Sequence, residues 1–433
     1  MRLSRSLTPF VLLFVVAPAV SAGVAILRTD YYQKTCPDFN KIVREAVIAK
    51  QGQQPTTAAG TLRLFFHDCF LEGCDASVLI ATNSFNKAER DDDLNDSLPG
   101  DAFDIVNRIK TALELSCPGV VSCADILAQA TRDLVTMVGG PYFDVKLGRK
   151  DGLESKAHKV RGNVPMPNQT VHDIHGMFKK NGFSLREMVA LSGAHTIGFS
   201  HCKEFSDRLY GSKADPEINP QFATALKKLC KNHTVDDTIA AFNDVMTPGK
   251  FDNMYFKNLK RGLGLLASDH LLIKNNRTKP FVELYATDEK AFFEDFARAM
   301  EKMGTVGVKG DGEGEVRRRV SCQTVNHSFQ VPSRELKGFH FCERGDPISS
   351  RCLLFDVRHL LFDVLRLLFA VRRLLFAVRR LLFAVRRLLF AVRRLLFAVH
   401  HLLLCPYRCS SCIFSIRRRL LCISLDPSSL RHH

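Results

Sequence analysis

The sequence predicts a mainly α-helical domain, and three observations support that fold class. Apolar residues recur at helical spacing in several segments of residues 28–326, helix-start signals precede them, and strand-like alternation is rare and short. In the segment 104–115, Ile105, Ile109 and Leu113 fall on one face of a helix. A chain that is 46% hydrophobic and 24% charged also has enough apolar material for a large core.

Helix starts are marked in the next two helical segments. Ser122 precedes Asp125 by the spacing of a capping box, and the helical pattern that follows stops at a glycine pair. Ser184 and Glu187 open a further segment in the same way. We therefore expect two helices that begin at these serines.

The last helical segment lies near the end of the predicted domain. Phe292, Phe296, Met300 and Met303 share one side of it, and Gly304 is expected to provide its C-cap. These segments together predict an all-α, or mainly α, domain of about 300 residues.

The segment 63–70, RLFFHDCF, places a fixed positive charge four residues before a histidine. In a helix, Arg63 and His67 share a face. Taken alone, they fit a hydrogen-bonded core histidine and an arginine that extends to solvent. They also fit a catalytic pair, so other parts of the sequence must decide between the two.

A second histidine lies in the segment 191–202, LSGAHTIGFSHC. Gly193 and Ala194 directly precede His195 near the end of the expected helix. Small side chains there would let a large flat group, such as a cofactor plane, approach the backbone. The alternative is a histidine at a helix C-terminus that interacts with the helix dipole.

Two short segments concentrate oxygen-bearing side chains. Their members are Asp68, Asp75 and Ser77 around Gly73, and Asp244, Thr247 and Asp252. Carboxylates at short spacing with other oxygen donors suit Ca²⁺. Ordinary surface turns would also explain each cluster singly, and neither follows the EF-hand pattern.

The chain divides into three parts by composition. Residues 1–22 begin with two arginines, continue through an apolar stretch and end in small residues, as a cleaved secretory signal peptide does and a membrane span does not. Residues 23–326 form the predicted domain. Residues 327–433 contain a seven-residue repeat, LLFAVRR, with variants. No transmembrane span is predicted.

The repeat gives neither a helix nor a strand a clean apolar face. On a helical wheel its phenylalanine lies between its two arginines, and in a strand its odd period turns every side chain over at each repeat. We interpret it as a disordered or helical basic tail that reflects recent duplication or an artefact of gene prediction. A basic helix on a membrane surface is the alternative.

The positive charge of the chain is concentrated in this tail. The tail has 18 Arg and 1 Lys against 6 acidic residues, which accounts for +13 of the net charge of +16. The remaining residues, 1–326, are nearly balanced at +3. The total charge is therefore no argument for a nucleic-acid partner, and none is predicted.

Eight cysteines precede residue 327, an even number in a chain with a predicted signal peptide. In an oxidising compartment such a set suggests four disulfides. Spacing alone leaves the pairing open, although Cys69 and Cys74 are close enough to close a small loop. No pair in this region has the C-x-x-C spacing of a zinc site. The N-x-[ST] sequons at Asn168, Asn232 and Asn276 fit a secreted glycoprotein.

Six motifs in chain order carry a family resemblance: RLFFHDCFLEGCDAS, VSCADILA, GGPYFDVKLGRKDG, LSGAHTIG, FDNMYFKNL and GLLASD. With the eight cysteines they resemble the class III secretory plant haem peroxidases, the horseradish type, over about Tyr31 to Asn326. The resemblance implies the haem peroxidase fold, with one haem b held between a distal and a proximal helical half.

The resemblance also implies roles on the distal face of the haem. His67 would accept a proton from peroxide and return it to the departing oxygen, and Arg63 would stabilise the charge that develops there. Asn95 would bond to His67 and keep it basic. Phe66 would cover the haem edge, and Pro165 would contact aromatic donors.

On the proximal face, His195 would be the axial ligand of the haem iron, and Asp269 would accept its other N–H. Two Ca²⁺ ions are also implied. The distal ion would use Asp68, Leu71, Gly73, Asp75 and Ser77, with Glu89 in the network leading to it. The proximal ion would use Thr196, Asp244, Thr247, Lys250 and Asp252. The implied disulfides are Cys36–Cys117, Cys69–Cys74, Cys123–Cys322 and Cys202–Cys230.

The implied protein is a secreted monomer, extracellular or in the cell wall, with the vacuole as an alternative. It would reduce hydrogen peroxide and oxidise small phenolic donors by one-electron steps, in oxidative stress and wall cross-linking. The competing hypothesis is a non-enzymatic wall or membrane-surface glycoprotein on the same scaffold. Two positions depart from the family: Phe143 replaces a common Trp, and Asn243 replaces a proximal aromatic residue of the horseradish enzyme.

Overall fold

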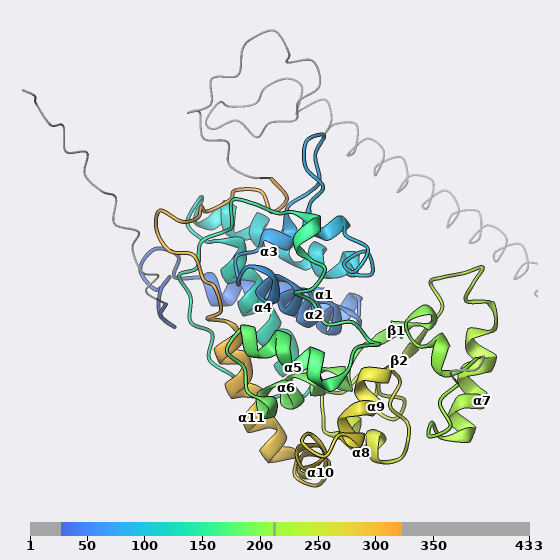
Figure 1. Cartoon of the computed structure of the whole chain (residues 1–433). Coiled ribbons are helices and arrows are strands. Elements are labelled where there is room, and N and C mark those ends of the chain that lie inside the picture. The colour runs from blue at the N-terminus through green and yellow to red at the C-terminus, as the bar shows by residue number, and fades with distance from the viewer. Residues whose placement is uncertain (1–26, 211–213, 323–433) are drawn as a thin grey trace, which may run out of the picture. The chain divides into compact units, whose positions relative to one another are not determined.

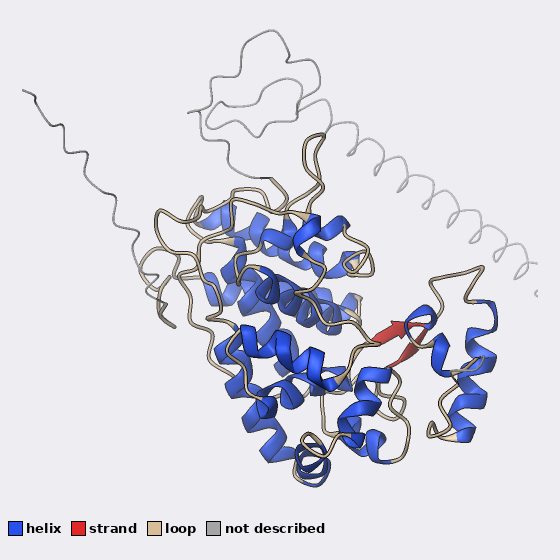
Figure 2. Cartoon of the chain, in the orientation of Figure 1, coloured by secondary structure: helices blue, strands red, loops and turns tan. Residues whose placement is uncertain are grey.

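Helices dominate the computed structural model, which describes residues 27–210 and 214–322 (Figures 1 and 2). The predicted signal peptide, residues 1–22, and the predicted tail, residues 327–433, lie outside the described residues. The α-helices within the described part are α1 (Phe39–Gln53), α2 (Thr57–Leu71), α3 (Gly100–Ser116), α4 (Cys123–Met137), α5 (Val171–Lys180), α6 (Leu185–Ser192), α7 (Pro220–Leu229), α8 (Met254–Lys260), α9 (Ala267–Lys274), α10 (Lys279–Thr287) and α11 (Glu289–Met303). The predicted mainly α fold is confirmed.

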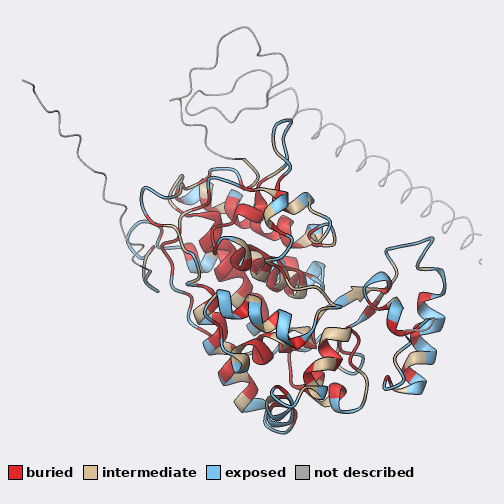
Figure 3. Ribbon diagram, viewed as in Figure 1, coloured by how far each residue is buried: buried red, intermediate tan, exposed pale blue. Residues whose placement is uncertain are grey.

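The first helical group contains α1 to α4, in which α2 packs against both α3 and α4 (Figure 1). α2 is buried on nearly all sides because its sequence, TAAGTLRLFFHDCFL, is apolar almost throughout. Gly60 allows close packing, since a Cβ there would overlap the ring of Pro99 just before α3. In Figure 3 the facing sides of these helices are red, which marks the core.

The second helical group contains α5, α6 and α8 to α11. α11 packs along α6, and α10 packs against α8 and α9. The predicted stripe of α11 is buried as expected: Phe292, Phe296, Met300 and Met303 are each at most 1% exposed. Gly304 is the C-cap, although its φ of −62° is right-handed.

The only strands in the described residues form a small antiparallel pair, β1 (Phe199–His201) and β2 (Ala240–Phe242), beside α7 (Figure 2). Phe199 pairs with Phe242 in the register. α7 and this pair surround a smaller apolar cluster that includes Phe205, Phe222 and Leu226. The Cys202–Cys230 disulfide lies within it.

The two predicted capping boxes differ in the structure. Ser184 and Glu187 form the complete reciprocal box at α6. At α4, Ser122 accepts from the backbone N–H of Asp125, but the return bond is missing. The Asp125 carboxylate instead accepts from the Tyr32 hydroxyl at 2.7 Å and pairs with Arg149 at 2.8 Å. The expectation of a full box was wrong because a buried ion pair uses the same side chain.

Arg149 connects the loop after α4 to the end of α11. It is 2% exposed, and its Nε donates to the carbonyl of Gly304 at 3.0 Å. A Cβ at position 304 would lie 2.9 Å from Nη2 of Arg149, so glycine is favoured there by close approach rather than by a left-handed backbone. Removing one member of a buried ion pair such as Arg149–Asp125 lowers the free energy of unfolding by about 3–5 kcal/mol.

Three of the four implied disulfides are present: Cys36–Cys117, Cys69–Cys74 and Cys202–Cys230. The fourth, Cys123–Cys322, is not formed, and that expectation is corrected here. Cys123 is fully buried at the start of α4 beside Asp151 and Arg317, and burial raises the pKa of its thiol to about 12. Cys322 is partly exposed and contacts Ser321 instead.

Candidate active site

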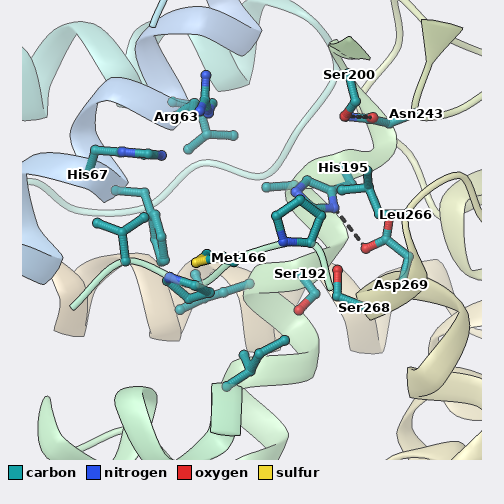
Figure 4. A pocket seen from close by; sticks show the side chains of 18 of the residues that line it. Arg63, His67, Met166, Ser192, His195, Ser200, Asn243, Leu266, Ser268 and Asp269 are labelled. Carbon is teal, nitrogen blue, oxygen red and sulfur yellow. Dashed lines mark hydrogen bonds and ion pairs between the residues drawn. The ribbon is translucent and has the colours of Figure 1, made fainter. Parts of the chain in front are cut away.

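A cavity of about 300 Å³ lies between the two helical groups (Figure 4). Residues of α2 line one wall, and residues of α6 and of the short 3-10 turn Gly193–Thr196 line the other. Most of the lining between these walls is apolar and includes Leu62, Ile174, Phe178, Leu191 and Leu272. His67 and His195 both face this space, from opposite walls.

His67 is held by a neutral amide. Its Nδ1 lies 2.6 Å from Oδ1 of Asn95, while Nδ2 of Asn95 donates to the carbonyl of Glu89 at 2.8 Å. The amide oxygen therefore accepts from Nδ1–H, which leaves Nε2 able to accept a proton. Burial, and then the charge of Arg63, lower the pKa of His67 to about 3, so the ring is neutral at pH 7.

Arg63 lies one turn before His67 on α2 and lines the same cavity, as its spacing predicted. Nη1 donates to the carbonyl of Ser97 at 2.9 Å, and Nη2 donates to the Ser97 hydroxyl at 3.1 Å. Burial lowers the pKa of Arg63 to about 10, which still leaves the guanidinium charged at pH 7. A fixed cation and a neutral imidazole thus share one wall.

Phe66 and Pro165 also line the cavity. Phe66 stacks on Phe70 of the same helix with ring centroids 4.1 Å apart, which fixes its plane. Pro165 lies on the loop before α5. Asn243 lines the cavity near the small sheet, where its Oδ1 accepts from the Ser200 hydroxyl at 2.7 Å (Figure 4).

His195 is held by a carboxylate rather than an amide. Its Nδ1 lies 2.9 Å from Oδ1 of Asp269, the dashed contact in Figure 4. Burial lowers the pKa of His195, but the charge and hydrogen bond of Asp269 outweigh it, so the net shift is upward. The side chain is 39% exposed, and since the residue lines the cavity, its Nε2 side has access to that space.

Tyr255 of α8 is a residue of this site that sequence reasoning missed. Its hydroxyl donates to the same Oδ1 of Asp269 at 2.8 Å. Burial first, and then the charge of Asp269, raise the pKa of Tyr255 well above its ordinary value. The residue stands within the motif FDNMYFKNL, but nothing in that pattern indicates that its hydroxyl reaches a carboxylate 14 residues later.

The expectation for Gly193 was wrong. A Cβ at this position would overlap the ring of Phe292 and lie 2.9 Å from Phe256, so the glycine makes room for core aromatic rings. It does not open the backbone to a cofactor plane. Ala194, the second small residue, does line the cavity.

The residues present fit a haem. The cavity offers a largely apolar lining for a flat macrocycle and a histidine whose Nδ1 is engaged by a carboxylate, which directs Nε2 to a metal. Among the described residues, the second carboxylate oxygen of Asp269 is buried and has no hydrogen-bond partner, so the negative charge stays close to that histidine.

The predicted distal oxygen cluster lies in the last turn of α2 and in the loop that follows this helix. Asp68 and Asp75 are 1% and 2% exposed, and the Ser77 hydroxyl donates to Oε2 of Glu89 at 3.0 Å. Burial, and then the charge of Asp75, raise the pKa of Glu89 to about 8 and also raise that of Asp68. Lys309 pairs with Asp75, whereas no described cation is in ion-pair contact with Asp68 or Glu89. This excess of buried acid suits a bound cation.

Leu71 and Gly73 are the two expected members of this cluster that would contribute backbone carbonyls. Leu71 is the last residue of α2, and Gly73 follows with a φ of +120°. A Cβ at Gly73 would overlap the backbone of Gly307, so only glycine fits.

The predicted proximal oxygen cluster directly follows His195. The Thr196 hydroxyl lies 3.5 Å from Oδ2 of Asp244 and 3.4 Å from Oδ1 of Asp252, and Thr247 contacts the same two oxygens at 3.0 and 3.2 Å. Lys250 differs from the other members, because its ammonium pairs with Asp252 at 3.4 Å. Only the carbonyl of Lys250 can therefore serve as a cation ligand.

Two carboxylates mark the mouth of the cavity. Asp93 and Glu204 both line it and are both exposed, so they lie where the cavity meets solvent. The opening is therefore more acidic than the walls.

The sequence of this chain is similar to those of known proteins. A family model described as Peroxidase matches residues 43–288. Peroxidase 65 of Arabidopsis thaliana is 89% identical over 330 residues, which covers 76% of this chain and 98% of that protein. Peroxidase 41 of the same plant is 76% identical over 310 residues, and Peroxidase 6 is 55% identical over 318. These alignments cover 72% of this chain in each case and 95% and 97% of the two relatives.

Proposed function

Because the chain belongs to the peroxidase family, among the class III plant peroxidases, we propose that its two cavity walls divide the reduction of hydrogen peroxide between them. The observation that carries this proposal is the pair of histidines that face one cavity with opposite partners, Asn95 and Asp269. Peroxidase activity and haem follow from the family itself. The non-enzymatic alternative has no support among the comparisons.

On the distal wall, His67 acts as base and then as acid. Its neutral Nε2 accepts a proton from the peroxide oxygen nearest to it and returns that proton to the oxygen that leaves. Asn95 holds the ring in the tautomer that this step needs. Arg63 stabilises the negative charge that develops on the leaving oxygen, since its guanidinium stays charged.

On the proximal wall, His195 is the iron ligand and Asp269 accepts its Nδ1–H. When bound, haem would supply the iron at which peroxide is reduced, and donors would return, one at a time, the two electrons that this reduction takes. Asp269 increases the electron density on His195 and fixes the orientation of its ring.

Small phenols are the proposed electron donors, each giving up one electron. They would approach the cavity mouth beside Pro165, while Phe66 restricts access to the interior. A flat aromatic ring suits a mouth with a proline surface, and the acidic rim of Asp93 and Glu204 favours donors that carry no negative charge.

Two Ca²⁺ ions are proposed at the oxygen clusters. Asp68, Asp75, Ser77 and the carbonyls of Leu71 and Gly73 would hold one, with Glu89 bonded to Ser77. Thr196, Asp244, Thr247, Asp252 and the Lys250 carbonyl would hold the other. Hard carboxylate, hydroxyl and carbonyl oxygens are the donors that Ca²⁺ prefers.

Secretion as a monomer, to the cell wall or extracellular space, is also proposed. Disulfides among the described residues support an oxidising destination. Across the described helices, none has the length and apolar character needed to cross a membrane.

The test is a spectroscopic titration of the full secreted chain, expressed with haem and calcium. Its Soret band should change when one equivalent of hydrogen peroxide is added and return to the resting spectrum on addition of guaiacol. An intact mass from the same sample would report which segments remain in the mature chain. Failure of folded, calcium-loaded protein to bind haem would contradict the proposal.

A further inference from the structure

Asp269 receives two hydrogen bonds on one oxygen, and the peroxidase reaction as described uses only one of them. His195 Nδ1 lies 2.9 Å from Oδ1, and the Tyr255 hydroxyl lies 2.8 Å from the same atom. The other oxygen, Oδ2, is buried and has no partner in the described structure. The two donors therefore compete for the charge on a single oxygen.

The surroundings make this competition strong. Asp269 is 2% exposed and Tyr255 is 1% exposed, so water does not screen either group. Hydrogen bonds to an ionised acceptor are about twice as strong as neutral ones. The Tyr255 ring also meets the His195 ring edge to face, at 85° and a centroid distance of 6.0 Å. The tyrosine is thus placed to act on the histidine through the carboxylate and to limit its rotation.

We propose that Tyr255 is a positioning residue that sets the reduction potential of the haem iron, by drawing charge from the Asp269 oxygen that accepts the His195 N–H. This inference rests on the proposed function of His195 as iron ligand. A donor that withdraws charge from Oδ1 weakens its pull on Nδ1–H, which makes His195 a less electron-rich ligand. A less electron-rich ligand favours Fe(II) over Fe(III) and so raises the potential.

The variant Tyr255→Phe isolates the hydroxyl, since it keeps the ring and its packing. Asp269 then gives its full charge to His195, and the Fe(III)/Fe(II) potential should become more negative. We expect a three- to tenfold change in the equilibrium constant, and tenfold corresponds to about 59 mV for a one-electron couple. The measurement is a mediated dithionite titration of the haem-loaded full chain, followed at the Soret band.

Tyr285→Phe is the matched control. Tyr285 is also a buried tyrosine that donates to a buried carboxylate, Asp295, at 2.6 Å, but it does not line the cavity. This variant should lose similar stability and leave the potential unchanged. If Tyr285→Phe moved the potential as far as Tyr255→Phe, a general loosening of the fold would explain both, and the inference would fail.

A second substitution keeps the test independent of how well Tyr255→Phe folds. Site-specific replacement of Tyr255 by 3-fluorotyrosine retains the hydroxyl and makes it a stronger donor, so the potential should move in the positive direction. An unchanged potential in both Tyr255 variants, with normal haem binding, would overturn the inference. Loss of haem by the wild-type chain would instead contradict the proposed function, so the two failures are distinguishable.

Discussion

The distal and proximal walls of the cavity use the same side chain in opposite surroundings. Burial, and then the charge of Arg63, lower the pKa of His67 to about 3, although its hydrogen bond with the Asn95 amide opposes this shift. His195 faces a carboxylate, and its pKa rises. An imidazole that stays neutral suits proton transfer, whereas one held by an anion suits a metal. The two histidines are the same side chain, so their different roles depend on their surroundings, and above all on the group that accepts the hydrogen bond from Nδ1.

Removing the distal histidine should break this division most severely. In His67→Leu, the second-order rate constant for reaction with hydrogen peroxide should fall about 10²–10⁴-fold, because no other group on that wall can exchange the proton. Haem binding should persist, since His195 is untouched. Stopped-flow absorbance measures the rate, and His172→Leu, an exposed histidine of α5, is the control. A fall smaller than about tenfold would contradict the role of His67.

Replacing the carboxylate that bonds to His195 with a neutral amide should make the proximal wall more like the distal wall. In Asp269→Asn, the anion that polarises His195 is lost, and the Fe(III)/Fe(II) potential should rise. A hydrogen bond to a charged group contributes about 1.5–3 kcal/mol, or roughly 65–130 mV for one electron. Redox titration provides the value, with Asp295→Asn as a buried carboxylate outside the cavity. An equal shift in that control would remove the special status of Asp269.

Asp295 is a buried carboxylate of the second helical group that lies away from the cavity, and its charge is expected to stabilise the fold. Burial raises its pKa, but hydrogen bonds from Tyr285 and Arg186 outweigh burial, and the net shift is downward. Because its pKa is lower in the folded state, the ionised carboxylate stabilises the fold at pH values above its unfolded-state pKa, near 4. This stabilisation is lost as the pH falls through the folded-state pKa.

Asp295→Asn should therefore lower the free energy of unfolding at pH 7 by about 1–2 kcal/mol, a figure reduced because Arg186 and Arg298 are largely exposed. The difference between variant and wild type should shrink at pH 3. Urea unfolding at both pH values measures it. An equal difference at the two pH values would show that packing, and not charge, is responsible.

The smallest expected effect concerns the mouth that the two walls share. In Asp93→Asn with Glu204→Gln, the KM for a phenol bearing a carboxylate should fall about two- to threefold at low salt, because exposed charges contribute only about 0.2–1 kcal/mol. The effect should fade in about 0.5 M salt. A neutral phenol and the variant Asp96→Asn are controls. An equal gain for the neutral phenol would point to shape instead of charge.

Local patterns predicted several helices, but not the contacts that position the site. Periodicity and capping signals indicated α3, α4, α6 and α11, because those signals act within a few residues. The roles of His67 and His195 came from family resemblance, since spacing alone also fitted a purely structural histidine at each position. The Arg149–Asp125 pair and the Arg149–Gly304 contact join residues 24 and 155 positions apart, and no local pattern reports them.

Two expectations differ from the structure, and they had different origins. Gly193 was assigned to a cofactor plane, although Phe292, 99 positions later, explains the missing side chain. Cys123 was paired with Cys322, although the structure buries it beside Arg317 and Asp151. For Gly193, long-range packing determined the surroundings of a residue whose near neighbours gave a different indication, whereas the Cys123–Cys322 pairing was implied by the family resemblance alone. Tyr255 was missed because its partner likewise lies outside its motif.

The arrangement of α2 has a consequence for how this protein can change over evolutionary time. Arg63 and His67 face the cavity, while Asp68 and Cys69 serve the loop behind the helix. Each residue advances the helix by about 100°, so inserting or deleting a single codon between Arg63 and Cys69 would turn one set away from its task. The bend at residues 83–86 is exposed at its first three positions, and Asn86 donates to the carbonyl of Ser155 at 2.6 Å. An exposed loop of this kind tolerates a change of length better than α2, which can accept substitutions but not an insertion or deletion.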